Sequence, residues 1–119
     1  MAYVDGYVMP IAKKHLATYR RLATISGKVW REHGALEYRE CVGDDLAVKM
    51  LTPFPRVLKI KRGETLVFAW VVFKTRAQRN RVNAKVMKDP RMAASMKDNP
   101  MPFDMKRILY GGFKVLVAA

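Results

Sequence analysis

The stretch "TLVFAWVVF", residues 65–73, decides the fold, because after Thr65 every position is apolar. A β-strand points successive side chains to opposite faces of its sheet, so both faces of this strand carry large apolar residues. Antiparallel sheets with one face in water normally alternate apolar and polar residues. The sequence therefore predicts a central strand with both faces covered, since a large exposed apolar patch marks an interaction surface.

The elements before this strand follow from periodicity. Residues 2–9, "AYVDGYVM", have the composition of a strand, which we expect Pro10 to end. Residues 13–33 have helical periodicity, and Gly34 stands where a helix C′ glycine belongs. Residues 35–42 are predicted to form a second strand. The inner stripe of the helix comprises Leu16, Tyr19, Leu22, Ala23, Ser26, Val29, Trp30 and His33.

Residues 43–63 are predicted to be a long loop, because they contain glycines, prolines and paired aspartates, with a short strand at Val57–Ile60. Gly111–Gly112 predict a bulge or a close backbone approach in the last strand. The remaining expected elements are a helix over 75–88, a helical turn near 91–97, a loop over 98–104 ("DNPMPFD") and a strand over 106–117.

The predicted order is βαββαβ, which is the ferredoxin-like pattern of the α+β class. It implies one domain over residues 1–119, with a four-stranded antiparallel sheet and two helices on one face. The other face needs a cover, and a second copy of the chain is the simplest one. A dimer interface buries about 800 Å² on each partner. At about 25 cal/mol/Å² the gross free energy gained is tens of kcal/mol, which exceeds an association cost of about 4–15 kcal/mol. We therefore expect a homodimer.

The net charge of +13 attracts anions in general. The basic residues are spread along the chain, which favours a solvated surface over a dedicated binding tail. Cys41 is the only cysteine, so an internal disulfide is excluded. We expect a cytoplasmic protein without a membrane segment, because Leu66–Phe73 is the longest apolar run and Asp5 interrupts the N-terminal stretch.

An RNA-recognition motif has the same element order, and it stacks exposed sheet aromatics on bases. "FAWVVF" (68–73) and "YVDG" (3–6) resemble parts of its two motifs. However, Leu66 and Val67 stand where the longer motif has a basic residue and glycine, and a twenty-residue loop separates the second and third strands. Alternating aromatic and β-branched residues are also ordinary strand content. Nucleic-acid binding is therefore the least favoured function.

A resemblance extends over the whole chain and is more specific. The sequence resembles the YbaA-like family of small bacterial proteins of unknown function, within the dimeric α+β barrel superfamily. The segments that carry it are "YVDGYVMP" (3–10), "GKVWREHGALEYRECVGDD" (27–45), "FPRVLKIKRGETLVFAW" (54–70), "VNAKVMKDPR" (82–91) and "MPFDMKRILYGGFK" (101–114). The resemblance implies two subunits packed sheet to sheet. It leaves the activity open, because the superfamily includes cofactor-free monooxygenases, lactone isomerases, haem-using enzymes and binding proteins.

The polar residues of the second strand divide between its faces. Glu37, Arg39 and Cys41 share one face, and Glu40 lies on the other among apolar positions. The two glutamates therefore cannot act as one carboxylate pair, whereas Glu37 and Arg39 can form an ion pair. A buried carboxylate needs a partner. We take Glu40 and His33, at the helix end, as candidates for proton transfer.

Arg79 and Asn83 fall on the core-facing stripe of the second helix, where a cation needs a carboxylate or a ligand. The available partners of Arg79 are Glu37, Glu40 and Asp5, and of these Glu40 is the one that Arg79 would best explain. Asp5, the one charge in the first strand, is expected to form an ion pair, or to bond across the dimer if its face of the sheet meets the partner subunit. The predicted ligand pocket between sheet and helices is lined by Trp30, His33, Trp70, Arg79, Asn83 and Tyr110, and Arg79 would hold an anionic or carbonyl-bearing organic ligand.

Whether the protein is an enzyme stays open. Neither histidine has a ligand-spaced partner and there is one cysteine, so we expect no metal site and no cofactor. A cofactor-free enzyme of monooxygenase or isomerase type requires a pocket with a carboxylate or histidine of shifted pKa. A structural dimer requires Asp5, Glu37, Glu40 and Arg79 to satisfy one another without a cavity. An RNA-binding protein requires Phe68 and Trp70 to be exposed.

Overall fold

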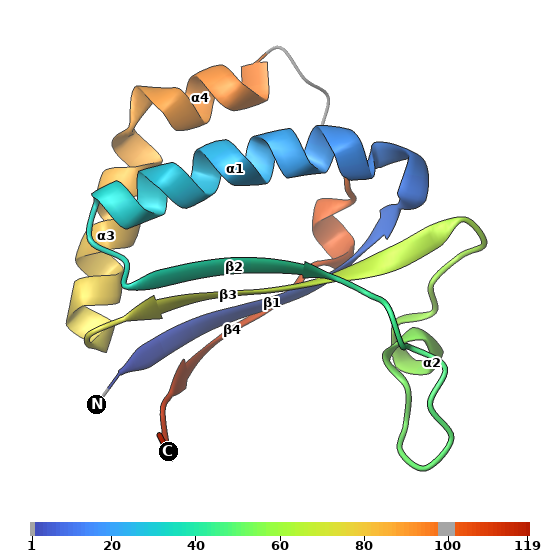
Figure 1. Ribbon diagram of the computed structural model, residues 1–119. Helices are drawn as coiled ribbons and strands as arrows, with labels where there is room; N and C mark the ends of the chain where they lie inside the picture. The colour runs from blue at the N-terminus through green and yellow to red at the C-terminus, as the bar shows by residue number, and fades with distance from the viewer. Residues whose placement is uncertain (1, 98–101) are drawn as a thin grey trace.

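The computed structural model describes residues 2–97 and 102–119. Four strands form one antiparallel sheet in the order β2-β3-β1-β4. Helices α1, α3 and α4 lie on one side of it (Figure 1). This is the ferredoxin-like α+β arrangement that the periodicity predicts. The elements are β1 (Tyr3–Ala12), η1 (Lys13–His15), α1 (Leu16–Glu32), β2 (Glu37–Val42), α2 (Phe54–Leu58), β3 (Glu64–Phe73), α3 (Arg76–Lys88), α4 (Pro90–Lys97), η2 (Met105–Arg107) and β4 (Leu109–Lys114).

The hydrophobic core lies between the sheet and the helices. The odd-numbered side chains of β1 and β3 point into it, and Phe73 and Val29 at its centre are fully buried. Val82 and Val86 are the buried residues of α3. The amphipathic stripe of α1 buries Leu22 and Val29 and half-buries the aromatic residues beside them. The stripe that the sequence predicts is therefore the face that packs on the sheet.

The other face of the sheet, called the open face below, carries the even-numbered side chains of β1 and β3 and the odd-numbered ones of β2 and β4. Phe68, Leu109 and Phe113 are 46, 52 and 61 % exposed on it. Together with Val4 and Trp70 they line a hollow of about 690 Å³. The two apolar faces expected of residues 65–73 are therefore present. Helices α1, α3 and α4 cover one of them (Figure 1), and on the open face Phe54 of α2 packs against Phe68 with ring centroids 6.5 Å apart.

Strand β1 extends beyond Pro10, which the sequence analysis took as its end. Pro10 pairs with Leu66 within a strand that continues to Ala12. The pairing of β1 with β4 stops at Val8, so beyond it β1 has one neighbouring strand. Proline is tolerated at such an edge because no strand there needs its missing N–H group.

The loop over 43–63 contains helix α2 where a strand at Val57–Ile60 was expected. Pro53 caps this helix with φ −72° and Pro55 stands in its first turn. Proline presets the backbone angle of a helix start, and Lys59 ends the helix in the left-handed conformation with φ 50°. The prediction of a strand was therefore wrong, because the local effect of the prolines outweighs a short apolar run.

The glycine predictions are confirmed at two positions. Gly34 follows α1 with φ 122°, a conformation that favours glycine at a helix end. Gly112 lies so close to the ring of Tyr3 that a side chain there would overlap it. Strand β4 is shorter than predicted, because η2 occupies residues 105–107. Residues 98–101 of the predicted loop over 98–104 lie outside the described part of the chain.

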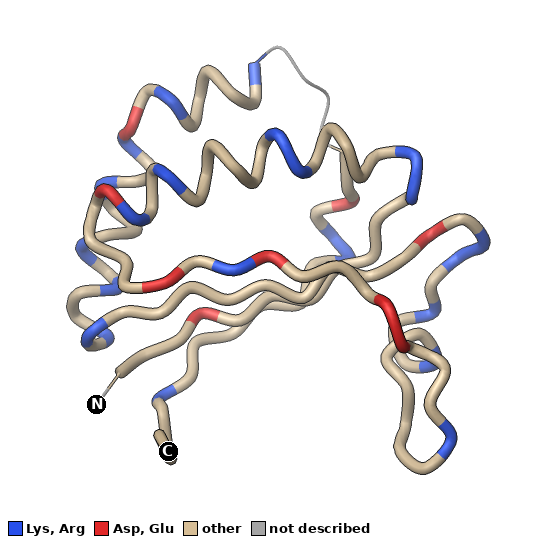
Figure 2. Tube along the Cα trace, in the orientation of Figure 1, with Lys and Arg blue, Asp and Glu red and all other residues tan. Residues whose placement is uncertain are grey.

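The basic residues are spread over the helices and the loops at the edges of the sheet (Figure 2). The strands at the centre of the sheet, β1 and β3, carry few charges along their lengths (Figure 2). In the described ranges, 2–97 and 102–119, no helix has the length and hydrophobicity to span a membrane.

Candidate functional site

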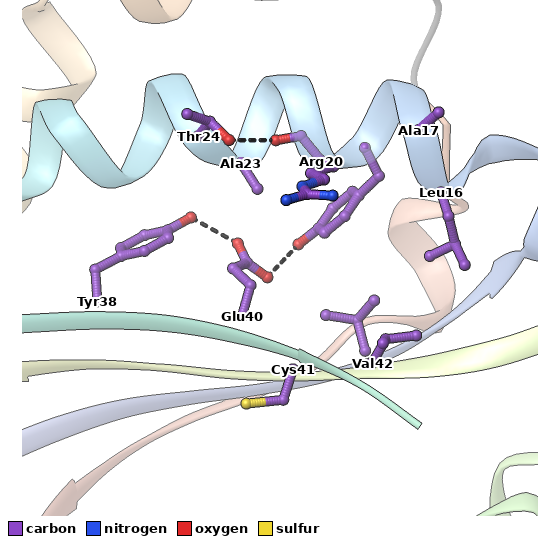
Figure 3. A pocket seen from close by; sticks show the side chains of 11 residues that line it. Leu16, Ala17, Arg20, Ala23, Thr24, Tyr38, Glu40, Cys41 and Val42 are labelled. Carbon is purple, nitrogen blue, oxygen red and sulfur yellow. Dashed lines mark hydrogen bonds between the residues drawn. The ribbon is translucent and has the colours of Figure 1, made fainter. Parts of the chain in front are cut away.

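A pocket of about 650 Å³ opens between α1 and the β2 edge of the sheet. Its walls are mostly apolar, and Glu40 projects from β2 into it, toward α1 (Figure 3). Cys41, the next residue of the strand, points its sulfur to the opposite side of the sheet (Figure 3). The lining residues are Leu16, Ala17, Tyr19, Arg20, Ala23, Thr24, Tyr38, Glu40, Cys41, Val42 and Val67.

Two tyrosines hold the carboxylate of Glu40. The Tyr19 hydroxyl donates to Oε1 at 2.5 Å, and the Tyr38 hydroxyl donates to Oε2 at 2.6 Å. The expectation that Arg79 pairs with Glu40 is therefore wrong. A carboxylate oxygen has two acceptor sites, so each oxygen of Glu40 keeps one lone pair for a further partner. The pocket thus contains a carboxylate that is oriented but can still accept a proton.

Both tyrosines remain neutral donors. Burial raises the pKa of the Tyr19 hydroxyl well above its ordinary value, and the negative charge of Glu40 raises it further. The pKa of the Tyr38 hydroxyl is raised by the same two causes in the same order. A phenol in this setting keeps its proton at any ordinary pH. The hydroxyl groups can therefore stabilise negative charge in the pocket, on Glu40 or on a bound molecule.

Packing fixes the two tyrosine rings. Tyr19 stands on the inner stripe of α1 and meets Phe103 edge to face, with ring centroids 5.8 Å apart. Tyr38 shares its strand face with Glu40 and packs against Trp30 at 5.9 Å. A Cβ atom at Gly27 would lie 3.0 Å from the Tyr38 ring, so the glycine leaves room for that ring. The hydroxyls are consequently held in place before any ligand arrives.

Arg79 forms a separate buried cluster with Asp5. Its Nη1 lies 3.3 Å from Oδ1 of Asp5 and donates to the Tyr110 hydroxyl at 2.7 Å. Tyr110 in turn donates to Asp5 at 3.0 Å, and the Arg79 guanidinium lies 4.9 Å from the Tyr3 ring centroid. Asp5 is fully buried on the helix side of the sheet. Asp5 therefore forms the ion pair that was one of its two expected roles, and it does so within the chain, because its side chain points to the helix side and not to the open face.

The same cluster includes two further residues expected to bind a ligand. The Trp30 indole donates to Oδ1 of Asn83 at 3.0 Å, and the Asn83 amide donates to Asp5 at 3.4 Å. The structure thus brings Trp30, Arg79, Asn83 and Tyr110 together, as predicted. Their polar groups bond to one another and to Asp5, and the pocket at Glu40 has other lining residues.

Trp70 does not join this cluster. It lies on the open face, where its indole donates to Glu37 at 2.8 Å. This hydrogen bond, followed by the charge of Arg39, lowers the pKa of Glu37 below its ordinary value. Arg39 Nε lies 3.5 Å from Glu37, which is the ion pair along the strand that alternation predicts. The placement of Trp70 between sheet and helices was wrong because β3 is apolar on both faces and gave no sign of which face the helices cover.

His33 lies at the C-terminal end of α1, away from Glu40. Its Nε2 is 2.8 Å from Oδ2 of Asp89, the residue between α3 and α4. His33 therefore does not line the pocket at Glu40, whose helical wall is the first half of α1, and its role in proton transfer stays a prediction. Among the described residues, 2–97 and 102–119, no three His, Cys, Asp or Glu side chains gather as a metal site.

Asp89 links α1 to α4. Hydrogen bonds from Arg91 and then from His33 lower the pKa of this carboxyl well below its ordinary value. A depressed carboxyl pKa stabilises the fold above the unfolded-state pKa, and this contribution is lost as pH falls toward the folded-state pKa. Asp89→Asn is therefore expected to lower the free energy of unfolding near neutral pH, and by a smaller amount at about pH 3, which lies below the ordinary aspartate pKa.

Urea denaturation of the wild type and Asp89→Asn at both pH values checks this expectation. Glu32→Gln is the matched control, because Glu32 is exposed and bonds Arg91 without touching His33. A difference between wild type and Asp89→Asn that stays constant with pH would contradict the role assigned to the Asp89 carboxylate.

Comparisons with known proteins place the chain in a family. The model of the family "Protein of unknown function (DUF1428)" matches residues 2–105. The uncharacterized protein YbaA of Escherichia coli (strain K12) is 35 % identical over 117 residues, which cover 98 % of each chain. This confirms the resemblance that the sequence segments carry.

Solved structures share the fold at low identity. A putative antibiotic biosynthesis monooxygenase from Nitrosomonas europaea has a TM-score of 0.63 at 10 % identity, covering 97 % of this chain and 90 % of its own. A dimeric ferredoxin-like protein of unknown function from Jannaschia sp. CCS1 has a TM-score of 0.59 at 14 % identity, covering 95 % and 99 %. With the family match and the full-length similarity to YbaA, the chain belongs to the DUF1428 family, whose function is unknown.

Proposed function

We propose that the protein is a homodimer that binds a small, mainly apolar organic molecule in the pocket at Glu40 and accepts a proton from it on that carboxylate. The single observation that carries this proposal is the setting of Glu40. Among the described residues that line this largely apolar pocket of about 650 Å³, Glu40 is the one acidic residue. Two neutral hydroxyl groups hold it, and neither is a cation that would neutralise it.

The pocket has the features of a small-molecule site. Such sites are concave and mainly apolar, with a few convergent polar groups that orient the ligand. Here Leu16, Val42 and Val67 supply apolar wall, and Glu40 with its two tyrosines supplies the polar centre. Arg20 also lines the pocket and adds positive charge for an anionic or carbonyl group of the ligand.

The alternative of a purely structural dimer is less well supported. It requires Asp5, Glu37, Glu40 and Arg79 to satisfy one another and leave no cavity. Asp5 and Arg79 do pair, whereas Glu40 bonds to tyrosines at the wall of a pocket. The fold neighbour from Nitrosomonas europaea is named as a putative monooxygenase, which is consistent with an enzyme on this fold but does not transfer an activity.

The open face is the basis for proposing a homodimer. Its exposed apolar surface, which includes Phe68, Leu109 and Phe113, has the character of an interaction surface. A second copy is the occupant that we propose, because the open face contains a concave apolar hollow, and the described residues that line this hollow include no charged side chain. The neighbour from Jannaschia sp. CCS1 is described as dimeric, which supports the same assembly.

Titration of ¹⁵N-labelled protein with 2-tetralone, an aromatic ketone, and with 2-naphthoate tests the ligand site. We expect chemical-shift changes to concentrate in residues 16–24 of α1 and 38–42 of β2. Glu40→Gln is expected to strengthen the binding of 2-naphthoate by about tenfold or more, because the variant removes a negative charge beside the carboxylate of the probe. Glu32→Gln removes the same charge from the exposed surface of α1 and is expected to bind like the wild type.

Shift changes confined to the open face, or equal affinity of wild type and Glu40→Gln for both probes, would contradict the proposed site. Because Glu40 is half-buried, the folding of the variant is checked by the dispersion of the same spectra.

A further inference from the structure

The arrangement around Glu40 also indicates the chemical class of its substrate; this inference rests on the proposed function. We propose that the substrate is an enolisable carbonyl compound, that Glu40 removes the proton from the carbon beside the carbonyl, and that Tyr19 and Tyr38 donate hydrogen bonds to the oxyanion that forms. The reaction class is proton transfer at carbon, either exchange or isomerisation.

Donors and base occupy adjacent positions, as such a substrate requires. The α-hydrogen and the carbonyl oxygen of a ketone are attached to neighbouring carbons, so a base and an oxyanion site must also be neighbours. The hydroxyls of Tyr19 and Tyr38 lie 2.5 and 2.6 Å from the two oxygens of Glu40. They approach from different elements, Tyr19 from α1 and Tyr38 from β2. A ketone that presents its α-hydrogen to Glu40 therefore places its oxygen near these donors.

The proton transfer changes the hydrogen-bond acceptor of the two tyrosine hydroxyls. The C–H bond breaks, its proton forms an O–H bond with Glu40, and its electron pair forms the C=C bond of the enolate. The carbonyl π electrons move onto oxygen, which becomes the oxyanion. Glu40 is then neutral and a weaker acceptor, so both hydroxyls gain by turning to the oxyanion. Return of the proton to the same or another carbon completes the reaction without an oxidant or reductant.

The donors are preorganised, which is the condition for oxyanion stabilisation to accelerate a reaction. Phe103 packs against the Tyr19 ring, and Trp30 with Gly27 confines the Tyr38 ring. Burial and the charge of Glu40 raise the pKa of both hydroxyls, so each one is a donor over the whole working pH range. The rings therefore stay in place when charge moves from Glu40 to the substrate, and only the hydroxyl protons reorient, by rotation about the C–O bonds.

A substrate that loses its proton from carbon fits the arrangement of Glu40 and the two tyrosines better than a substrate that loses its proton from oxygen. Proton transfer between oxygen atoms is fast without help, whereas removal of a proton from carbon is slow because charge must move onto a distant oxygen. A base with two fixed donors lowers the energy of that charge. The base supplied by Glu40 and the donors supplied by Tyr19 and Tyr38 are therefore the two components that a carbon acid requires.

The experiment measures exchange of the α-hydrogens of 2-tetralone with D₂O by proton NMR, with and without the protein. We expect the wild type to accelerate exchange and Glu40→Gln to lose about 10²- to 10⁴-fold of that rate. Tyr19→Phe and Tyr38→Phe are each expected to lower kcat by about 10²-fold with little change in KM. Tyr3→Phe is the matched control, because its hydroxyl bonds Arg79 in the other cluster.

The outcomes separate this inference from the proposed function. If Glu40→Gln loses the activity while both tyrosine variants keep it, the oxyanion role is overturned and the ligand site stands. If 2-tetralone binds at Glu40 but the wild type accelerates exchange of neither it nor phenylacetone, the carbon-acid class is overturned. If the ketone does not bind at Glu40, the proposed function itself fails. Circular dichroism of each variant confirms that the fold is retained.

Discussion

Replacement of Asp5 by alanine is expected to lower the free energy of unfolding by about 3–5 kcal/mol, the typical cost of removing one partner of a buried ion pair. Asp5 is fully buried and accepts hydrogen bonds from Arg79, Tyr110 and Asn83. Without the carboxylate, the guanidinium of Arg79 keeps its charge in an environment where its side chain is 14 % exposed. Urea denaturation followed by circular dichroism measures the loss.

The double variant Asp5→Leu with Arg79→Met is the matched control. Replacing both partners of a buried pair by apolar residues is often neutral or stabilising, so the double variant is expected to regain most of the lost stability. A loss below about 1 kcal/mol for Asp5→Ala, the range of an exposed pair, would show that the cluster is not the buried ion pair described here.

Phe68→Glu is expected to convert the proposed dimer into monomers. Phe68 is 46 % exposed on the open face, between Phe54 and Trp70, so a single chain tolerates a charge there. In a dimer through that face, each copy would bury a carboxylate without a partner, at a cost of several kcal/mol. The dissociation constant is therefore expected to rise by at least about 100-fold.

Light scattering after size exclusion checks this expectation. The wild type should have twice the 13.6 kDa mass of one chain, and Phe68→Glu should have the mass of one. Met87→Glu is the control, because Met87 is 69 % exposed on α3, on the far side of the sheet. A monomeric wild type, or a Phe68→Glu variant that stays dimeric, would contradict association through the open face.

The sequence was sufficient for the architecture because periodicity reports it directly. The apolar run at residues 65–73 gave the central strand, and the inner stripe of residues 13–33 gave α1. Helix α2 was missed because two prolines imposed a local conformation. The assignment of Trp70 to a face failed for a general reason: alternation divides a strand into two faces but does not say which one the helices cover.

The site was recovered in part. Glu40 was identified because a carboxylate among apolar strand positions needs a partner, but the partner was sought among charged residues. Tyr19 already stood on the predicted inner stripe of α1, and Tyr38 shared the strand face of Glu40. A neutral hydroxyl can satisfy a carboxylate as a cation does, and that signal was available in the sequence. Arg79 pairs with Asp5, which lies 74 positions away along the chain, and spacing in the sequence does not reveal such a contact.

The most direct test of the site at Glu40 is a crystal structure of the protein soaked with 2-tetralone. The account predicts the ketone in the pocket between α1 and β2, with its oxygen within hydrogen-bond distance of the Tyr19 and Tyr38 hydroxyls and its α-carbon beside the Glu40 carboxylate. Ordered ketone on the open face, against Phe68 and Phe113, with the pocket at Glu40 holding none, would contradict it.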